Sequence, residues 1–541
     1  MTLGKSPTHE DLYQSTAEFC EARLGESSIY RVLHREGHRL FPDEMFADLF
    51  QDVGRRSVPP RIVAVVMVLQ RIEGLSDREA VDRFAFDLRW KYAAGGLGFD
   101  HSGFVHTVLV DQRARLRNSE RPNRIFEAVL DVAKQAGLVG RKRVLDSTAI
   151  YDAVATQDTV TLIRAAIRSV LRVAAAEGLA SELRRVLRRD DDYVSAGKPV
   201  CEWDDQHARE ALVDALAHDG MSVLAQLDGR KLSRDLTEAM TLLATVLGQD
   251  LEQTENGVFR IARRVAKDRV ISTVDPEARH GHKTSARSFD GYKGHVAIDP
   301  DSEIITATEV TAGNVADGKV AESLLTDVLP EMPTPKIEPA QSREPEAVAD
   351  GERIEVYGDA SYGTAALVER LQGASIEPNV KVQPAISRDG RFSQEAFTID
   401  TTAQTVTCPA GRLVTLRLRS NGVAEGTFRA HCGNCPIRER CTTSPFRQIS
   451  VHPKHETLQH ERTRQRDPAW KKRYRSTRPK VERKLAHMMQ RRHGGRRARV
   501  RGSVRIRHDF ALLAAATNLR RLGVLGVRWI DGAWAMAPAE E

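Results

Sequence analysis

Residues 143–149 read Arg-Val-Leu-Asp-Ser-Thr-Ala, a short β-prone run with Asp146 inside it. A second apolar run, at 354–359, ends on Asp359 and is followed by Ser-Tyr-Gly. A carboxylate in such a place is costly to desolvate unless a positive group faces it. Ligand sites collect at strand ends in sheets that are combined with helices. The two runs therefore predict an α/β protein whose sheet carries two functional acids.

A third acid lies in the most basic part of the chain. Glu482 is the only acid between Asp467 and Asp509. Pro479 predicts a helix start, and apolar residues then recur at helical spacing, so Glu482 lies beside the core-facing side of this helix. Three carboxylates that converge would hold two Mg²⁺ ions, with Mn²⁺ as a substitute. Such a pair activates a water or a 3′-hydroxyl for in-line phosphoryl displacement.

The charge distribution predicts a polyanionic partner. The chain has 541 residues and a net charge of +7, yet residues 461–507 carry 19 Lys and Arg against three acids. So dense a positive charge indicates a nucleic-acid partner. The helix–turn–helix-like spacing within residues 57–118 favours double-stranded DNA. A solvated basic helix is the alternative interpretation.

The composition argues against a membrane-spanning, secreted or disulfide-rich protein. Hydrophobic residues make up 41% and charged residues 29% of the chain, which is typical of a globular protein. No run approaches the ~20 apolar residues of a membrane span, so no membrane partner is expected. The polar first residues lack the apolar region of a secretory signal. Six cysteines do not make a disulfide scaffold. We therefore expect a cytoplasmic, nucleoid-associated protein.

The N-terminal part predicts paired helices. Ser76-Asp77-Arg78-Glu79 matches a capping box, in which the serine and the glutamate cap each other's backbone amides. Arg78 and Arg83 would then be exposed on a helix–turn–helix-like pair and contact DNA. Helical pairs without such a role are common, and that alternative stays open.

Strand character appears at 285–298 and 303–310, after a long helical stretch. Lys293 lies on the first of these strands, next to the expected Asp146 strand, and either contacts DNA or lines the sheet. Residues 331–352 are rich in Pro and Glu and predict a surface loop. Gly313–Val320 fits Gly-x-x-x-x-Gly-Lys, but Val320 replaces the hydroxyl residue that would bind Mg²⁺, which argues against an ATP site.

Four cysteines have the spacing of a zinc site. They follow C-x23-C-x2-C-x5-C and are Cys408, Cys432, Cys435 and Cys441. Four thiolates hold Zn²⁺ tetrahedrally, and a CxxC pair is the usual half-site. Reduced, buried thiols without metal are the alternative.

Seven segments in this order together resemble the DDE transposases of the IS1182 family, within the IS4/IS5-like group. The segments are Ser57–Asp100, Val144–Thr148, 274–299, 310–318, 356–363, 432–441 and 478–488. The resemblance covers most of residues 57–518. It implies an RNase H-like catalytic core, with the first Asp on the first strand, the second just after the fourth strand and the Glu on a later helix.

Carried over by position, the resemblance assigns Asp146, Asp359 and Glu482 as the catalytic, metal-binding acids. Arg478 matches the Arg of the related Y-R-E-K signature. Tyr474 is one residue too far from Arg478 for that signature, and Met489 stands where its Lys is expected. The resemblance then leaves the contact of that Lys with DNA to Arg491 or Arg492.

These expectations divide the chain into eight parts around an RNase H-like mixed sheet core with a large helical insertion, a helical N-terminal domain and a small cysteine-rich subdomain. The parts are a helical segment (1–56), a helical DNA-binding domain (57–135), the first part of the core (140–157), a helical insertion (158–270), the continued core (271–400), a cysteine-rich subdomain (401–450), a basic helical end of the core (451–525) and a tail (526–541).

The resemblance implies a transposase of a mobile insertion sequence, an enzyme for DNA recombination. It would cleave DNA strands at terminal inverted repeats with Mg²⁺, transfer them into target DNA and act as a homo-oligomer, because two ends must be joined. The alternative is a non-catalytic DNA-binding regulator that combines a helix–turn–helix with a zinc knuckle. That alternative explains the basic stripe but not the acid at its centre.

Overall fold

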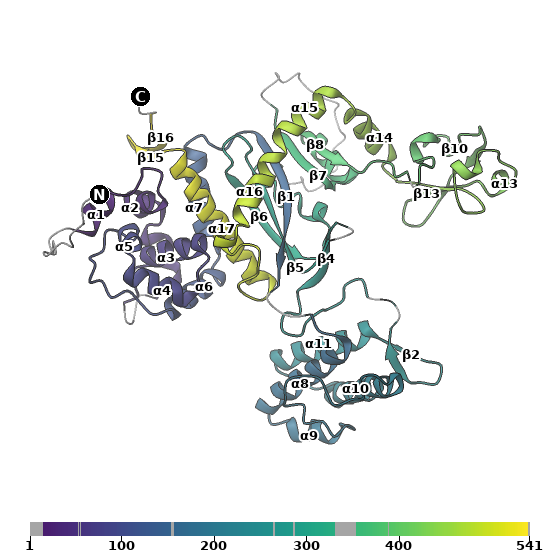
Figure 1. The fold of residues 1–541 in the computed structure, drawn as a ribbon, viewed down its shortest axis with the longest axis horizontal. Coiled ribbons are helices and arrows are strands. Elements are labelled where there is room, and N and C mark those ends of the chain that lie inside the picture. Colours follow the sequence, from purple (N-terminus) through teal and green to yellow (C-terminus); the bar gives the residue numbers. More distant parts are fainter. Residues whose placement is uncertain are drawn as a thin grey trace, which may run out of the picture.

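The computed structural model describes residues 15–51, 54, 56–152, 156–262, 264, 266–284, 287–330, 353–387 and 389–538. The loop expected at 331–352 lies outside these residues. A central mixed sheet is flanked by an N-terminal helical domain on one side, a helical body below and a small cysteine-rich subdomain at the far right (Figure 1). The prediction of an α/β fold built on a mixed sheet is confirmed.

The main sheet has six strands. They are β1 (Lys142–Tyr151), β4 (Arg279–Thr284), β5 (Arg287–Ile298), β6 (Ile305–Ala312), β7 (Glu355–Gly363) and β8 (Glu377–Val382). The strand order is β4-β5-β1-β7-β8, with β6 also paired to β5. β5 is antiparallel to β1, whereas β7 is parallel to β1 and to β8. Parallel pairs need long crossovers, and between β7 and β8 the chain leaves the sheet to form the helix Ala365–Gly373.

Alternating residues of β1 serve two different cores. Val144 faces a cluster that also contains Val296 and the buried side of α17 (Ser503–Val524). Leu145 faces the opposite cluster, built with α12 (Ala365–Gly373). Successive side chains of a strand point to opposite faces, so the apolar run around Asp146 is buried on both sides.

The N-terminal helices share the core on the α17 side of the sheet rather than forming one of their own. They are α1 (Thr16–Glu21), α2 (Ile29–Leu40), the 3₁₀ helix η1 (Asp43–Leu49), α3 (Pro60–Glu73), α4 (Asp77–Phe86), α5 (Leu88–Ala93), α6 (Thr107–Arg117) and α7 (Arg124–Gln135). The predicted capping box is confirmed, because Ser76 and Glu79 cap each other's backbone amides at the start of α4. This domain is therefore fixed against the sheet through α17.

Two bodies are inserted into this core. The first contains α8 (Thr159–Ala176), α9 (Ala180–Arg185), α10 (Gln206–Leu227), α11 (Arg234–Asp250), β2 (Leu251–Gln253) and β3 (Phe259–Ile261), and it has a hydrophobic core of its own. The second, cysteine-rich body contains β9 (Thr398–Asp400), β10 (Thr405–Thr407), β11 (Leu413–Thr415), β12 (Arg417–Leu418), β13 (Ala424–Thr427), α13 (Arg429–Cys432) and β14 (Gln448–Val451). Both extend away from the sheet (Figure 1).

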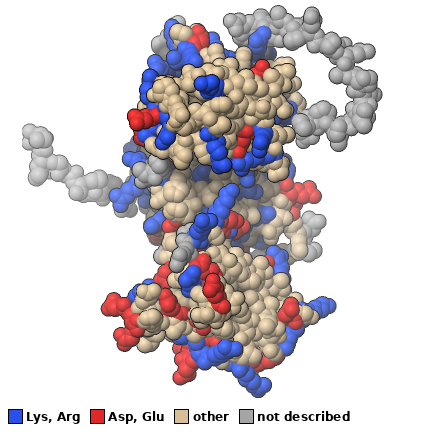
Figure 2. All heavy atoms as spheres, turned by 90° about the vertical axis from the view of Figure 1, so that its right-hand side faces the viewer, with Lys and Arg blue, Asp and Glu red and all other residues tan. Residues whose placement is uncertain are grey.

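After the second body the chain returns to the sheet. It forms α14 (His455–Arg464), α15 (Pro468–Thr477), α16 (Pro479–Met488), the 3₁₀ helix η5 (Arg491–His493), α17, and a final hairpin of β15 (Val527–Ile530) and β16 (Ala533–Met536). Among the described residues, no helix is both long and apolar enough to cross a membrane. Figure 2 shows Lys and Arg side chains over the upper part of one face with fewer Asp and Glu among them, while both charges are common on the lower part.

Candidate active site

The acids of β1 and β7 lie where these two strands stop pairing. The parallel pairing joins Lys142–Val144 to Glu355–Tyr357 and ends there. Asp146 and Asp359 are each two residues beyond the last pair. Asp359 lies inside β7 rather than just after it, but its ladder to β8 is also interrupted, between Gly358 and Gly363. Strands that separate in this way leave room for side chains at the carboxyl edge of the sheet.

Arg478 brings the three predicted acids together. Its Nη2 lies 2.9 Å from Asp146 Oδ1 and 3.8 Å from Asp359 Oδ2. Its Nη1 donates to Asp146 Oδ2 at 3.2 Å and lies 3.8 Å from Glu482 Oε1. One guanidinium thus contacts carboxylates from β1, β7 and α16.

The helical junction explains how Arg478 reaches this place. It stands between the end of α15 and Pro479, the first residue of α16. Val481, Leu485 and Met488 are buried on the core side of α16, as the helical spacing predicted. Only 7% of the Arg478 side chain is exposed, so packing of the two helices holds the guanidinium over the sheet.

The three carboxylates have different surroundings. Burial raises the pKa of Asp146, and the charge and hydrogen bonds of Arg478, together with the backbone N–H of Ser147, oppose that rise. Asp359 is 41% exposed and accepts a hydrogen bond from the backbone N–H of Ser361 at 2.9 Å. Glu482 is 62% exposed. The site therefore has one buried acid and two that water reaches.

Two departures from the Y-R-E-K pattern have a structural explanation. Tyr474 lies one helical turn before Arg478, and its hydroxyl donates to the carbonyl oxygen of Gly358, next to Asp359, at 3.1 Å. It therefore reaches the site despite the extra residue. Met489 is only 5% exposed and belongs to the hydrophobic core. The side chain at that position thus packs in the hydrophobic core.

A second polar network lies against the same strands, and sequence reasoning missed it. Asp317 accepts hydrogen bonds from the Ser147 hydroxyl at 2.6 Å and from Lys293 Nζ at 2.8 Å. His295 is fully buried, between Tyr362 Oη at 3.0 Å and Thr311 Oγ1 at 2.9 Å.

The sequence offers one sign of this network. Asp317 stands in the Gly-rich turn after β6, which a P-loop interpretation would have assigned to phosphate. Lys293 is 15% exposed and is paired with this acid. Its amine therefore lines the sheet in this structure, which is the second of the two roles considered for it.

The other predicted DNA contacts lie at the surface. Arg78 and Arg83 are exposed on α4, and Arg83 forms a loose ion pair with Asp87 at 3.7 Å. Arg491 and Arg492 are exposed on η5, directly after α16. These positions leave all four guanidinium groups accessible to a polyanion.

The four cysteines meet in the second inserted body. Cys408, Cys432, Cys435 and Cys441 line one small cavity together with His431. Burial raises the pKa of Cys441, Arg447 lowers it, and the other three cysteines raise it further. Within the described ranges, however, no three His, Cys, Asp or Glu side chains are grouped closely enough to hold a metal ion.

Two family models match the chain: residues 407–523 match the transposase DDE domain, and residues 21–115 match a transposase domain (DUF772). No curated protein and no solved structure matches. The chain thus carries two transposase-type regions, and these support a transposase function. Transposases of the DDE type typically use divalent metal ions.

The matched regions do not contain the whole site. Arg478 and Glu482 lie inside the DDE match, whereas Asp146 and Asp359 lie outside it. The two aspartates are connected to the matched region through their contacts with Arg478.

Proposed function

We propose that this protein is a DDE transposase of the IS1182 type that cuts DNA at terminal inverted repeats and joins the freed ends to target DNA. The observation that carries the proposal is the contact of one buried guanidinium with three acids from distant parts of the chain. The order of β1, β5, β6, β7 and β8, with an acid in the first and fourth of these strands, supports an RNase H-like core.

The chemistry consists of two phosphoryl transfers. In the first, a water oxygen attacks a phosphorus atom at the element end, the bond from phosphorus to the 3′ oxygen breaks, and a 3′-hydroxyl and a 5′-phosphate result. In the second, that 3′ oxygen attacks a target phosphodiester and displaces the 3′ oxygen of the target strand. Each step exchanges one P–O bond for another, so no energy-supplying cofactor is needed.

The donor set suits magnesium. Asp146, Asp359 and Glu482 offer only carboxylate oxygens, which are the ligands that Mg²⁺ prefers. When bound, a pair of such ions polarises the phosphate and lowers the pKa of the attacking hydroxyl. In the structure, Arg478 supplies the positive charge between the acids. We propose that Arg478 keeps the buried carboxylate of Asp146 ionised, and that Arg491 and Arg492 hold the DNA backbone beside α16.

Zinc has a structural role in this proposal. The four cysteines are the donor set of a closed tetrahedral site, and all of them border one cavity. They would hold the short strands of the second inserted body together, away from the three acids.

The proposal is tested by nicking of supercoiled plasmid that carries the element ends, in Mg²⁺ or Mn²⁺. Asp146→Asn, Asp359→Asn and Glu482→Gln should each abolish nicking while DNA retention in gel shifts survives. Glu238→Gln, an exposed change on α11, is the matched control and should cut normally. A protein that lacks all three acids and still cuts would refute the assignment. DNA binding without any cutting by the unmodified chain would favour the regulator.

A further inference from the structure

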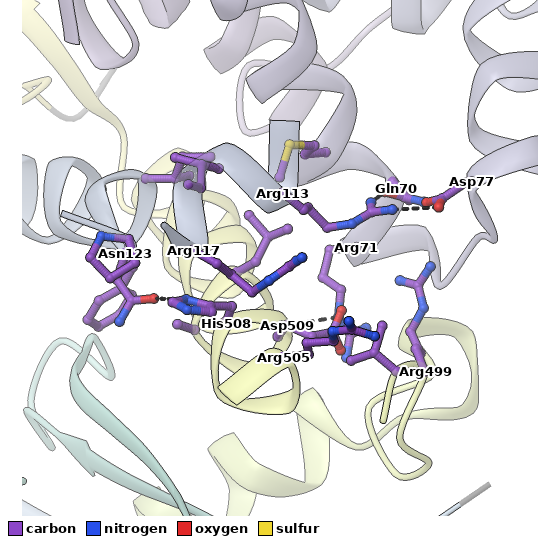
Figure 3. A pocket seen from close by; sticks show the side chains of 18 of the residues that line it. Gln70, Arg71, Asp77, Arg113, Arg117, Asn123, Arg499, Arg505, His508 and Asp509 are labelled. Atoms are coloured by element: carbon purple, nitrogen blue, oxygen red, sulfur yellow. Dashed lines mark hydrogen bonds and ion pairs between the residues drawn. The ribbon is translucent and has the colours of Figure 1, made fainter. Parts of the chain in front are cut away.

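A cavity of about 270 Å³ lies where the N-terminal helices meet the start of α17 (Figure 3). Residues of α3, α4, α6 and α7 form one wall, and the segment 499–512 forms the other. The cavity shares no lining residue with the three acids described above. It is therefore a separate feature of the fold.

The lining combines an apolar floor with an excess of positive charge. The apolar lining residues are Met67, Leu116, Pro122, Ile125, Phe126, Val500, Ala511 and Leu512. Five arginines line the same space against two aspartates, Asp77 and Asp509. In Figure 3, Arg113 and Arg117 arrive from α6, and Arg499 and Arg505 arrive from the opposite wall.

Both aspartates already pair with arginines. Asp509 lies 3.1 Å from Arg71 Nε, and Asp77 accepts a hydrogen bond from Arg113. Across the part of the chain that the structure describes, Arg117 and Arg505 have neither an ion pair nor a hydrogen bond. Arg117 is half-buried and Arg505 is exposed, and both line the cavity.

Grouping these like charges is electrostatically unfavourable. Burial lowers the pKa of Arg117, and the positive charges of Arg505 and Arg113 lower it further. Guanidinium groups bind phosphate through paired, charge-assisted hydrogen bonds. An anion between Arg117 and Arg505 would replace this repulsion by attraction and fill their unused donors.

We propose that this cavity binds an organic phosphate, with the phosphate held by Arg117 and Arg505 and the remainder of the molecule packed on the apolar floor beside Leu116 and Phe126. The cavity volume, about 270 Å³, is just below the usual range of small-molecule sites. The cavity is therefore matched to a single nucleotide-sized group rather than to a larger ligand. Such a group exists as a free mononucleotide or as the 5′-phosphorylated end of a DNA strand.

The experiment measures binding to the full chain in EDTA, so that it needs no cleavage and does not depend on the three acids. Thymidine monophosphate and a short single strand, with and without a 5′-phosphate, are titrated by calorimetry and by the shift in Tm. The test variant is Arg117→Gln with Arg505→Gln. Arg115→Gln is the matched control, because Arg115 is exposed on the same helix and lies over the Phe50 ring instead.

The double variant should weaken phosphate binding by about 100-fold or more, since two charge-assisted contacts are lost. The control should bind as the unmodified chain does. Without ligand, the Tm of the double variant should be no lower than that of the unmodified chain, because repulsion is relieved. This last result separates lost binding from misfolding.

Each source of phosphate has its own outcome. Binding of thymidine monophosphate that the double variant loses supports the proposal and identifies a free nucleotide as sufficient. Binding of the strand only when it carries a 5′-phosphate supports the proposal with a DNA end as ligand. The proposal is overturned if thymidine monophosphate does not bind and the two strands bind equally, or if the binding is unchanged in the double variant.

Discussion

Replacing Arg478 by Met tests whether this guanidinium holds the site together. Met keeps most of the side-chain length but removes the charge. Asp146 and Arg478 are 14% and 7% exposed, so little water would replace the lost partner. Removing one partner of a buried pair costs about 3–5 kcal/mol. We expect the free energy of unfolding of Arg478→Met to fall by that amount at pH 8.

The loss of stability in Arg478→Met should be smaller at low pH. Burial already raises the pKa of Asp146, and loss of Arg478 raises it further. The cost comes from an unpaired carboxylate, so it is present above the folded-state pKa of Asp146 and disappears as the pH falls through that pKa. Arg478→Met should therefore approach the stability of the unmodified chain on acidification.

Urea unfolding followed by circular dichroism, in EDTA at pH 8 and at pH 5, measures both effects. Adding Asp146→Asn to Arg478→Met removes the unpaired charge and should restore most of the stability at pH 8. Mg²⁺ should stabilise Arg478→Met more than the unmodified chain, because a divalent ion takes over the positive charge. A double variant no more stable than Arg478→Met would refute the reasoning.

Three further predictions concern other parts of the molecule. Burial lowers the pKa of His295 from 6.5 to about 4, so the unfolded chain binds a proton before the folded chain does on acidification. The free energy of unfolding should therefore drop by up to about 3 kcal/mol between pH 6.5 and pH 4. His295→Gln should reduce this dependence of the free energy of unfolding on pH. Ser76→Ala should cost about 1 kcal/mol in urea unfolding, whereas Ser76→Thr keeps the cap. Elemental analysis should find about one zinc per chain, and a chain without zinc, or a Cys435→Ser variant that retains it, would contradict the cysteine site.

Local patterns in the sequence predicted the parts of the site that depend on neighbouring residues. The apolar runs around Asp146 and Asp359 became strands of one sheet, and Pro479 began the helix that carries Glu482. The capping residues of α4 were also recognisable, because a capping box involves only four consecutive positions.

Long-range pairing was harder to predict. Lys293 carries a charge that suggested DNA, but its partner Asp317 comes from a turn 24 residues later. Arg117 and Arg505 line the same cavity between α6 and α17. The sequence around either residue does not predict that the other lies nearby. Such contacts arise only when the N-terminal helices share a core with the sheet, which hydrophobic periodicity alone does not specify.

The separation between Asp146 and Arg478 has a consequence for protein synthesis. These residues are 332 positions apart, with both inserted bodies between them. Domains begin to fold as they leave the ribosome, yet the carboxylates gain their shared counter-charge only after α15 and α16 have been translated. A product truncated between α7 and α15 would carry the N-terminal helices without an assembled set of acids. Under the function proposed above, fragments released by incomplete translation would therefore lack the complete set of acids that cleavage requires.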